Sequence, residues 1–131
     1  MNNCYVNVCG GIGNQLFQDA NGYSYSRKHT KDLYIDTSSW TASQGQSPEV
    51  YKDTIFKNFK YGSSVYRNVI PITEKEFNYG PLPFLEGSVS LTGYYQSLKY
   101  FDDYLDVLKG KIFLPEVKTC HIHDKSVAFH I

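Results

Sequence analysis

The sequence predicts an α/β domain in which helices flank a parallel sheet. Residues 4–9 form a short run with apolar positions, and a glycine-rich turn and a stretch with helical spacing follow it directly. A second strand-like run comes next, at residues 31–36. A strand, a helix and a strand in this order form a right-handed βαβ unit and imply a parallel sheet. With 131 residues, the chain is expected to form a single domain over residues 1–131.

The first predicted helix covers residues 14–28. Its apolar side chains recur at spacings of three and four residues and are expected to face the sheet; these are Leu16, Phe17, Ala20 and Tyr23. Gly22 lowers the helical propensity, but it would let the helix and a strand pack closely. Residues 37–48 are polar, contain a glycine and a proline, and predict a loop.

The second half of the chain predicts shorter elements. Residues 96–109 have the clearest helical period, and Gly110 follows as a C-terminal stop. The inward positions of that helix would be Leu98, Phe101, Tyr104, Leu105 and Leu108. The remaining predictions are a short helix or irregular segment at 50–61 and strands at 66–70 (closed by Pro71), 89–94 and 125–131.

Charge and hydropathy exclude several classes of protein. The 13 basic and 13 acidic residues balance and form no basic cluster, so a nucleic-acid partner is not expected. No run of about 18 apolar residues predicts a membrane span, and the N-terminus has no features of a signal peptide. The three cysteines are odd in number, and two of them fall on one short strand with opposite orientations. We therefore expect a reducing, cytoplasmic location.

The glycine-rich turn is the strongest candidate for a functional site. Three glycines within four residues allow unusual backbone angles, and the first amides of the following helix have no intrahelical partner. Together with the helix dipole, these amides suit an anion. The spacing matches neither a dinucleotide fingerprint, because Leu16 stands where the third glycine would be, nor a Walker loop, which needs a lysine. Spacing alone leaves phosphate binding and a simple tight turn as alternatives.

The identities of the residues in this turn are more specific. Residues 10–18, Gly-Gly-Ile-Gly-Asn-Gln-Leu-Phe-Gln, resemble the opening motif of the α-1,2-fucosyltransferases. Residues 91–101, Leu-Thr-Gly-Tyr-Tyr-Gln-Ser-Leu-Lys-Tyr-Phe, resemble a second segment of that family. Residues 126–131 resemble the strand that leads into a His-x-Arg-Arg-x-Asp motif, with His130 as its histidine; the arginines and the acid would follow Ile131.

The resemblance implies an inverting transfer of fucose from GDP-fucose to a galactoside hydroxyl, in α-1,2 linkage and with no metal or other cofactor. It also implies a fold, the Rossmann-like N-terminal domain of a two-domain GT-B-type glycosyltransferase, whose active site lies between two α/β halves. Only one wall of that cleft would be present here, because the C-terminal nucleotide-sugar-binding half is absent from the chain. The partners would be a nucleotide sugar, a glycan acceptor and that missing half, and we expect little activity from this chain alone.

The predicted site residues follow from the turn and from the resemblance. The substrate would contact Gly10, Gly11, Ile12, Gly13, Asn14, Gln15 and Gln96. By resemblance, Asn14 lies beside the diphosphate and the sugar and is a candidate catalytic residue, as is His130; Asn14 would alternatively cap the helix. Gln96 would reach the acceptor or the glycine turn, or it would only cap the following helix or bind to the backbone.

Two further features have structural alternatives. Asp36 follows a predicted strand, where parallel sheets place functional residues, but an aspartate there more often caps a turn. Cys120, His121 and His123 lie close in sequence, yet a second cluster for a four-ligand metal site is lacking, so no metal is predicted. For the whole chain, the alternative functions are a non-catalytic module that binds a glycan or a protein, derived from a truncated transferase, and an unrelated nucleotide-binding domain.

Overall fold

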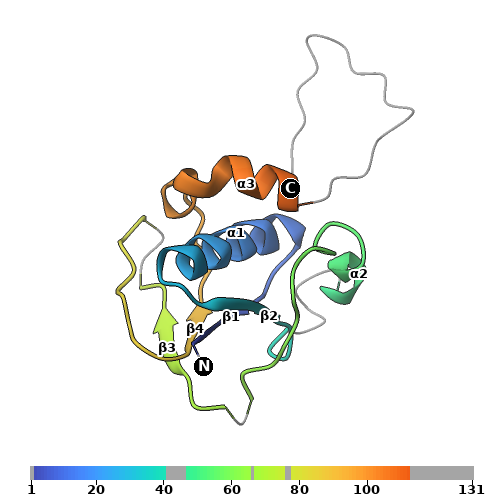
Figure 1. The fold of residues 1–131 in the computed structure, drawn as a ribbon. Coiled ribbons are helices and arrows are strands. Elements are labelled where there is room, and N and C mark those ends of the chain that lie inside the picture. The colour runs from blue at the N-terminus through green and yellow to red at the C-terminus, as the bar shows by residue number, and fades with distance from the viewer. Residues whose placement is uncertain (1, 41–46, 66, 76–77, 113–131) are drawn as a thin grey trace, which may run out of the picture.

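The computed structural model describes residues 2–40, 47–65, 67–75 and 78–112, which form a four-stranded parallel sheet flanked by helices (Figure 1). The strand order is β2-β1-β4-β3, and every neighbouring pair is parallel. The predicted α/β class with a parallel sheet is therefore confirmed. The strands are β1 (Asn3–Asn7), β2 (Asp32–Asp36), β3 (Ile70–Thr73) and β4 (Val89–Thr92).

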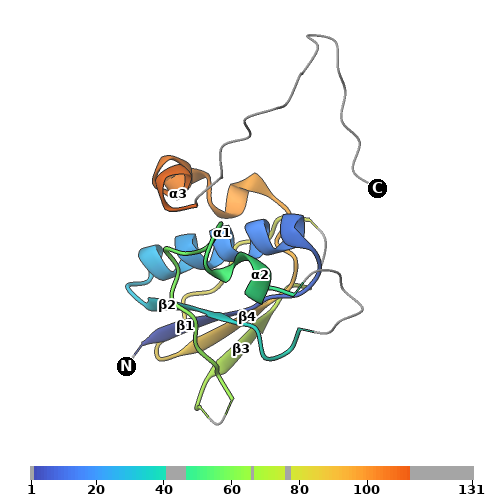
Figure 2. The same cartoon turned by 90° about the vertical axis from the view of Figure 1, so that its right-hand side faces the viewer.

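Helix α1 (Ile12–Lys28) covers one face of this sheet and itself lies beneath α3 (Leu105–Lys111), so that sheet, α1 and α3 are stacked (Figure 2). Gly22 faces the sheet, where a Cβ atom would collide with Val6, and this confirms the predicted close packing. The predicted direction of the apolar stripe is wrong. Phe17 and Tyr23 instead contact aromatic rings that precede α3, with centroid distances of 5.9 Å to Phe101 and 6.1 Å to Tyr104.

The side of α1 that faces away from α3 is polar and small, which explains the wrong prediction. The buried residues that share the sheet-facing side with Gly22 are polar, namely Gln15, Gln18, Asp19 and Ser26. A helix that is covered on two sides buries both faces. The spacing of its apolar residues then marks only the buried face that is apolar. In α1 that face is the one toward α3.

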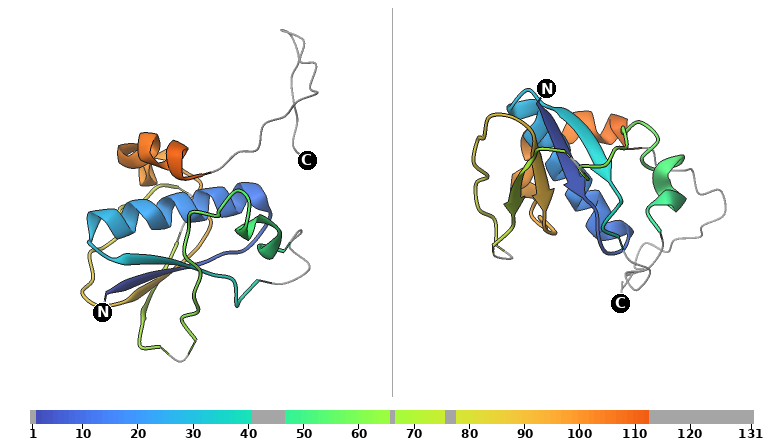
Figure 3. Two further views of the ribbon diagram at one scale, coloured as in Figure 1. Left: turned by 45° about the vertical axis from the view of Figure 1, so that its right-hand side comes forward. Right: turned by 90° about the horizontal axis from the view of Figure 1, so that it is seen from below.

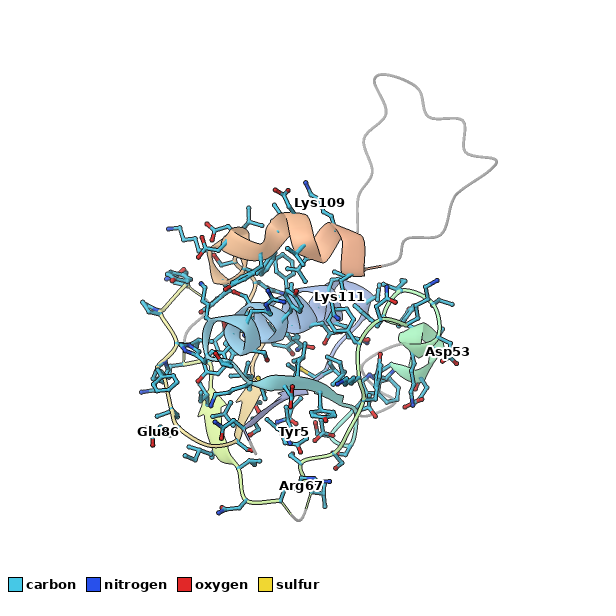
Figure 4. The ribbon with its side chains drawn as sticks, viewed as in Figure 1. Tyr5, Asp53, Arg67, Glu86, Lys109 and Lys111 are labelled. Carbon is cyan, nitrogen blue, oxygen red and sulfur yellow. The ribbon has the colours of Figure 1, made fainter. Side chains whose placement is uncertain are left out.

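The predicted helix at 96–109 is also corrected. Two 3-10 turns, Leu98–Tyr100 and Asp102–Tyr104, come first, and the α-helix begins only at Leu105 and includes Gly110. Phe101 has φ −142° and ψ 13°, which interrupts the helix between the two turns. Figure 4 shows Lys109 on the outer side of α3 and Lys111 on the side toward α1, where its ammonium group lies 5.5 Å from the ring centroid of Tyr23.

Smaller differences concern the ends of elements. The first strand ends at Asn7, so Cys9 lies in the following turn, and the fourth ends at Thr92. The strand predicted at 66–70 instead runs over Ile70–Thr73 and includes Pro71, which the sheet tolerates because β3 is an edge strand. Between 47 and 65 a short helix, α2 (Glu49–Lys52), is followed by turns, as predicted. The predicted strand at 125–131 lies outside the described residues.

Among the described residues, the face of the sheet opposite α1 is covered by the segment between α2 and β3 rather than by a long helix. The segment between α2 and β3 passes beneath the strands (Figure 3) and pairs at Tyr61 with Ile35 of β2. Tyr5 and Tyr34 stack on this face with a centroid distance of 5.6 Å.

In the part of the chain that the structure describes, no helix is long and apolar enough to cross a bilayer.

Candidate functional site

The glycine turn lies at the carboxyl end of β1, beside the carboxyl end of β4. From β1 the chain passes through α1 to β2 on one side, and it later returns through β3 to β4 on the other side of β1. The loops that leave β1 and β4 begin side by side at the carboxyl ends of two adjacent strands, which the register pairs up to Asn7 and Thr92, and both lead to helices on the same face of the sheet (Figure 2). Open parallel sheets bind ligands at this kind of position.

The first turn of α1 leaves its amide groups open to this position. Gly11 is the N-cap, with φ −79° and ψ −175°; no side chain caps the helix, and no acidic residue stands in its first turn. A Cβ atom on Gly11 or on Gly13 would meet no heavy atom within 4 Å. The N–H groups of this turn have no intrahelical acceptor, and the helix dipole adds positive potential. The arrangement suits an anion, and the backbone of Gly11 and Gly13 can be approached without meeting a side chain.

The shape of the turn is fixed by Gly10 and Gln15. Gly10 has φ +75°, in the left-handed region, and a Cβ atom there would collide with the side-chain amide of Asn14. Gln15 is 1% exposed, and its Nε2 donates to the carbonyl of Gly10 at 3.1 Å. The turn therefore needs glycine at position 10 and is held from behind by the helix that it precedes.

Gln18 joins the two loops of the site. Its Oε1 accepts a hydrogen bond from the Cys9 N–H at 3.1 Å. Its Nε2 donates to the carbonyl of Gly93, beyond the end of β4, and to the sulfur of Cys9, both at 3.0 Å. Because the side chain is buried, with 1% exposed, it fixes the end of β1 relative to the end of β4.

The side chains of Asn14 and Gln96 are hydrogen-bonded to each other beside the first turn of α1. The Nε2 atom of Gln96 donates to Oδ1 of Asn14 at 2.6 Å, although 82 residues separate them. Asn14 is the third residue of α1, so the alternative that it caps the helix is wrong; Gly11 takes that place. The two carboxamides, one from each loop, form a neutral polar bridge in front of the helix terminus.

The turn after β4 is held by the carboxylate of Glu74, the residue that follows β3. Oε1 and Oε2 of Glu74 accept hydrogen bonds from the N–H groups of Tyr94 and Tyr95, both at 3.1 Å. Tyr95 has φ +51° and Gly93 has φ +146°, conformations that side chains rarely adopt. The Tyr95 hydroxyl in turn donates to the carbonyls of Ile72 and Thr92 at 3.3 and 3.1 Å. This network directs the following residue, Gln96, toward Asn14.

Asp36 is a structural clamp. Its Oδ1 accepts hydrogen bonds from the Ser38 N–H and hydroxyl at 2.9 and 2.6 Å, and its Oδ2 accepts from the same two groups of Ser64 at 2.8 and 2.9 Å. Burial alone would raise the pKa of Asp36, but these hydrogen bonds outweigh it and hold the pKa below the ordinary value. The turn-capping alternative is therefore correct for Asp36, and its acceptor positions are occupied.

Charge at the site comes from the backbone rather than from side chains. Neither residues 9–18 nor residues 92–98 contain a lysine or an arginine. Asp19, one turn further along α1, is buried, and burial raises its pKa well above the ordinary value and so favours the uncharged acid. Within the described ranges, no group of three His, Cys, Asp or Glu side chains could hold a metal ion.

The structure brings together the predicted residues that it describes, namely the turn from Gly10 to Gly13, Asn14, Gln15 and Gln96. His130 and the cluster Cys120, His121 and His123 lie outside the described residues. Sequence reasoning did not select Gln18 or Glu74 as residues that position the site. The four-residue spacing of Asn14 and Gln18 puts both on one side of a helix and was an available signal. The role of Glu74 depends on the pairing of β3 with β4, which no local pattern reveals.

Comparison with known proteins adds no relative. No protein-family model matches the chain, and no curated protein and no solved structure is significantly similar to it. What is established is therefore the class of fold, an α/β domain with a four-stranded parallel sheet, in which the carboxamides of Asn14 and Gln96 meet beyond the carboxyl ends of β1 and β4.

Proposed function

We propose that this chain is the N-terminal half of a GT-B-type fucosyltransferase and that its glycine turn binds the diphosphate of GDP-fucose. The bridge between Gln96 and Asn14 is the observation that carries the proposal. Both residues belong to the segments that resemble the α-1,2-fucosyltransferases, and they meet beside the open amides of α1 at the carboxyl ends of two parallel strands.

The chemistry asked of this half is stabilisation of the leaving group. When the fucosyl group is transferred with inversion, the bond between its anomeric carbon and the diphosphate breaks. Negative charge then develops on the diphosphate of the departing GDP. The first-turn amides of α1 are fixed in place before the reaction, so they lower the energy of this charge without reorganising. The Nδ2 group of Asn14 is a further donor, and the Gln96 bridge orients its carboxamide. No metal ion is required for this role.

Removal of the proton from the acceptor hydroxyl needs a base from elsewhere. Among the described carboxylates near the site, those of Glu74 and Asp36 are bound to N–H and hydroxyl groups, and that of Asp19 is buried. We therefore expect this chain alone to bind donor fragments weakly and to transfer little fucose. A galactoside α-1,2-fucosyltransferase would complete the site with its second half.

Ligand-observed NMR tests the binding step. We expect saturation transfer from the protein to GDP, weaker transfer to guanosine, and competition by inorganic pyrophosphate, because the contact is to the diphosphate. Equal binding of guanosine and GDP, or no binding of either at millimolar concentration, would contradict the proposal.

The second candidate is a module that binds a glycan or a protein without catalysis. The lack of an unbound carboxylate near the described site favours it. A transfer assay with GDP-fucose and lactose separates the two: robust turnover by this chain excludes the module and also contradicts the expected dependence on a second half.

A further inference from the structure

A second concave region lies beside the edge strand β3. Its volume is about 450 Å³, and β3 with its C-terminal extension forms one wall. Residues 78–83 form the other wall, and Tyr100 lies between the walls. The register aligns Thr73 with Thr92 and Thr92 with Asn7, so this hollow begins two strands, or about 10 Å, from the end of β1.

The aromatic side chains of this hollow are fixed in place. Tyr79 is 41% exposed, yet its ring rests on that of Tyr100 with a centroid distance of 4.8 Å. Tyr100 is buried and packs edge-on against Tyr95 at 5.2 Å, and its hydroxyl accepts a hydrogen bond from the Gly80 N–H at 3.1 Å. The three rings form a continuous row from the exposed wall of the hollow to the residue that precedes Gln96.

The polar groups of the hollow suit an uncharged ligand. Thr73 and Asn78 are exposed and supply a hydroxyl and a carboxamide. The one acid in the lining, Glu74, is bound to two backbone N–H groups, and Lys75 is the one cation. The ammonium group of Lys99, which is not part of the lining, lies over the ring of Tyr79 at 5.8 Å from its centroid. A concave wall with an exposed aromatic ring and a few neutral donors and acceptors is typical of small-molecule sites.

We propose that this hollow binds a neutral sugar residue of the glycan acceptor, with Tyr79 as the ring on which the sugar packs. A pyranose has one face of C–H groups, which packs on an aromatic ring while its hydroxyl groups bind polar side chains. Binding in the hollow is independent of the donor, whereas its role as the acceptor side rests on the proposed function. The row of three tyrosines then connects the proposed sugar site with Gln96, beside the proposed diphosphate site.

Saturation-transfer NMR with lactose and GDP in the same sample tests this inference. We expect lactose to bind the unchanged chain, and Tyr79→Ala to weaken lactose binding by about tenfold without affecting GDP. Tyr79→Phe keeps the ring and is expected to bind lactose normally. Phe84→Ala is a matched control, because Phe84 is a 59% exposed aromatic residue of the same loop outside the hollow's lining.

The outcomes separate the two proposals. Binding of GDP without binding of lactose, or lactose binding unchanged in Tyr79→Ala, overturns the sugar site and leaves the proposed function in place. Binding of lactose that depends on Tyr79, without binding of GDP, supports the sugar site and overturns the diphosphate site. An unchanged thermal midpoint of each variant shows that the loss is local.

Discussion

The Nε2 atom of Gln18 lies 3.0 Å from the carbonyl oxygen of Gly93, and this bond fixes the separation of the two loops that form the site. The same carboxamide binds the backbone N–H of Cys9. One buried side chain thus holds the ends of β1 and β4 together. The open amides of α1 and the Asn14–Gln96 bridge both depend on this geometry.

Replacing Gln18 by alanine is expected to destabilise the fold. The change leaves the Cys9 N–H and the Gly93 carbonyl without their partner, and each buried group left unpaired costs about 1–3 kcal/mol. We expect a loss of about 2–4 kcal/mol in the free energy of unfolding, measured by urea denaturation. Gln96→Ala is the control: Gln96 is exposed, and its removal is expected to cost about 1 kcal/mol or less. Equal losses for the two variants would contradict the role of Gln18.

Gly10→Ala is expected to disturb the turn itself. The left-handed backbone at φ +75° disfavours any Cβ atom, and the added methyl group collides with the Asn14 amide. We expect a loss of about 1–3 kcal/mol of stability and displacement of the Asn14 side chain. Gly11→Ala is the comparison, since its Cβ meets no atom within 4 Å, and it is expected to lose less than about 1 kcal/mol. Thermal unfolding of both variants checks this, and the reverse order of stability would refute it.

Asp36 is expected to stabilise the fold above the ordinary pKa of an aspartate. Because its pKa is lowered in the folded state, its contribution is complete at neutral pH and is lost as the pH falls through the folded pKa. Asp36→Asn is expected to remove this pH dependence and to lower stability at pH 7. Chemical denaturation at several acidic pH values measures the slope, and an unchanged slope in the variant would exclude Asp36 as its source.

Asp19 is expected to act in the opposite direction. Its pKa is raised by burial, so its unfavourable contribution grows as the pH rises above the ordinary pKa of an aspartate, about 4. Neither carboxylate oxygen has a hydrogen-bond partner among the described residues. Asp19→Asn is therefore expected to gain stability relative to the unchanged chain on going from pH 4 to pH 7, whereas Asp106→Asn, at an exposed acid, should not. No relative gain between the two pH values would show that burial does not raise the pKa of Asp19.

Local pattern predicted the fold class because the strand–turn–helix–strand order is written in residues 4–36. It failed where an element has two buried sides. The apolar stripe of α1 faces α3, and the side toward the strands is polar because it carries the side chains that hold the site, such as Gln15 and Gln18. It also failed between 96 and 109, where the helical period continued through Phe101 although the backbone leaves the helix there. The bridge from Asn14 to Gln96 needs the parallel register of β1 and β4, which is a tertiary property.

Gly13 allows the proposed diphosphate site to be tested with two variants whose new side chains have the same size. The residue is exposed in the first turn of α1, and a side chain there meets no atom within 4 Å, so both Gly13→Asp and Gly13→Asn are compatible with the fold. The carboxylate of Gly13→Asp interacts favourably with the helix dipole and should stabilise the fold by about 0.3–1 kcal/mol relative to Gly13→Asn. It should also repel a diphosphate, which the neutral carboxamide does not.

The most direct measurement is a titration of the ¹⁵N-labelled chain and these two variants with GDP, followed by the amide resonances. We predict that GDP shifts the amide resonances of Gly11, Ile12 and Asn14 in the unchanged chain and in Gly13→Asn. In the more stable Gly13→Asp, these resonance shifts are expected to be largely lost. Shifts confined to other parts of the chain, or equal shifts in both variants, would contradict a diphosphate site at the start of α1.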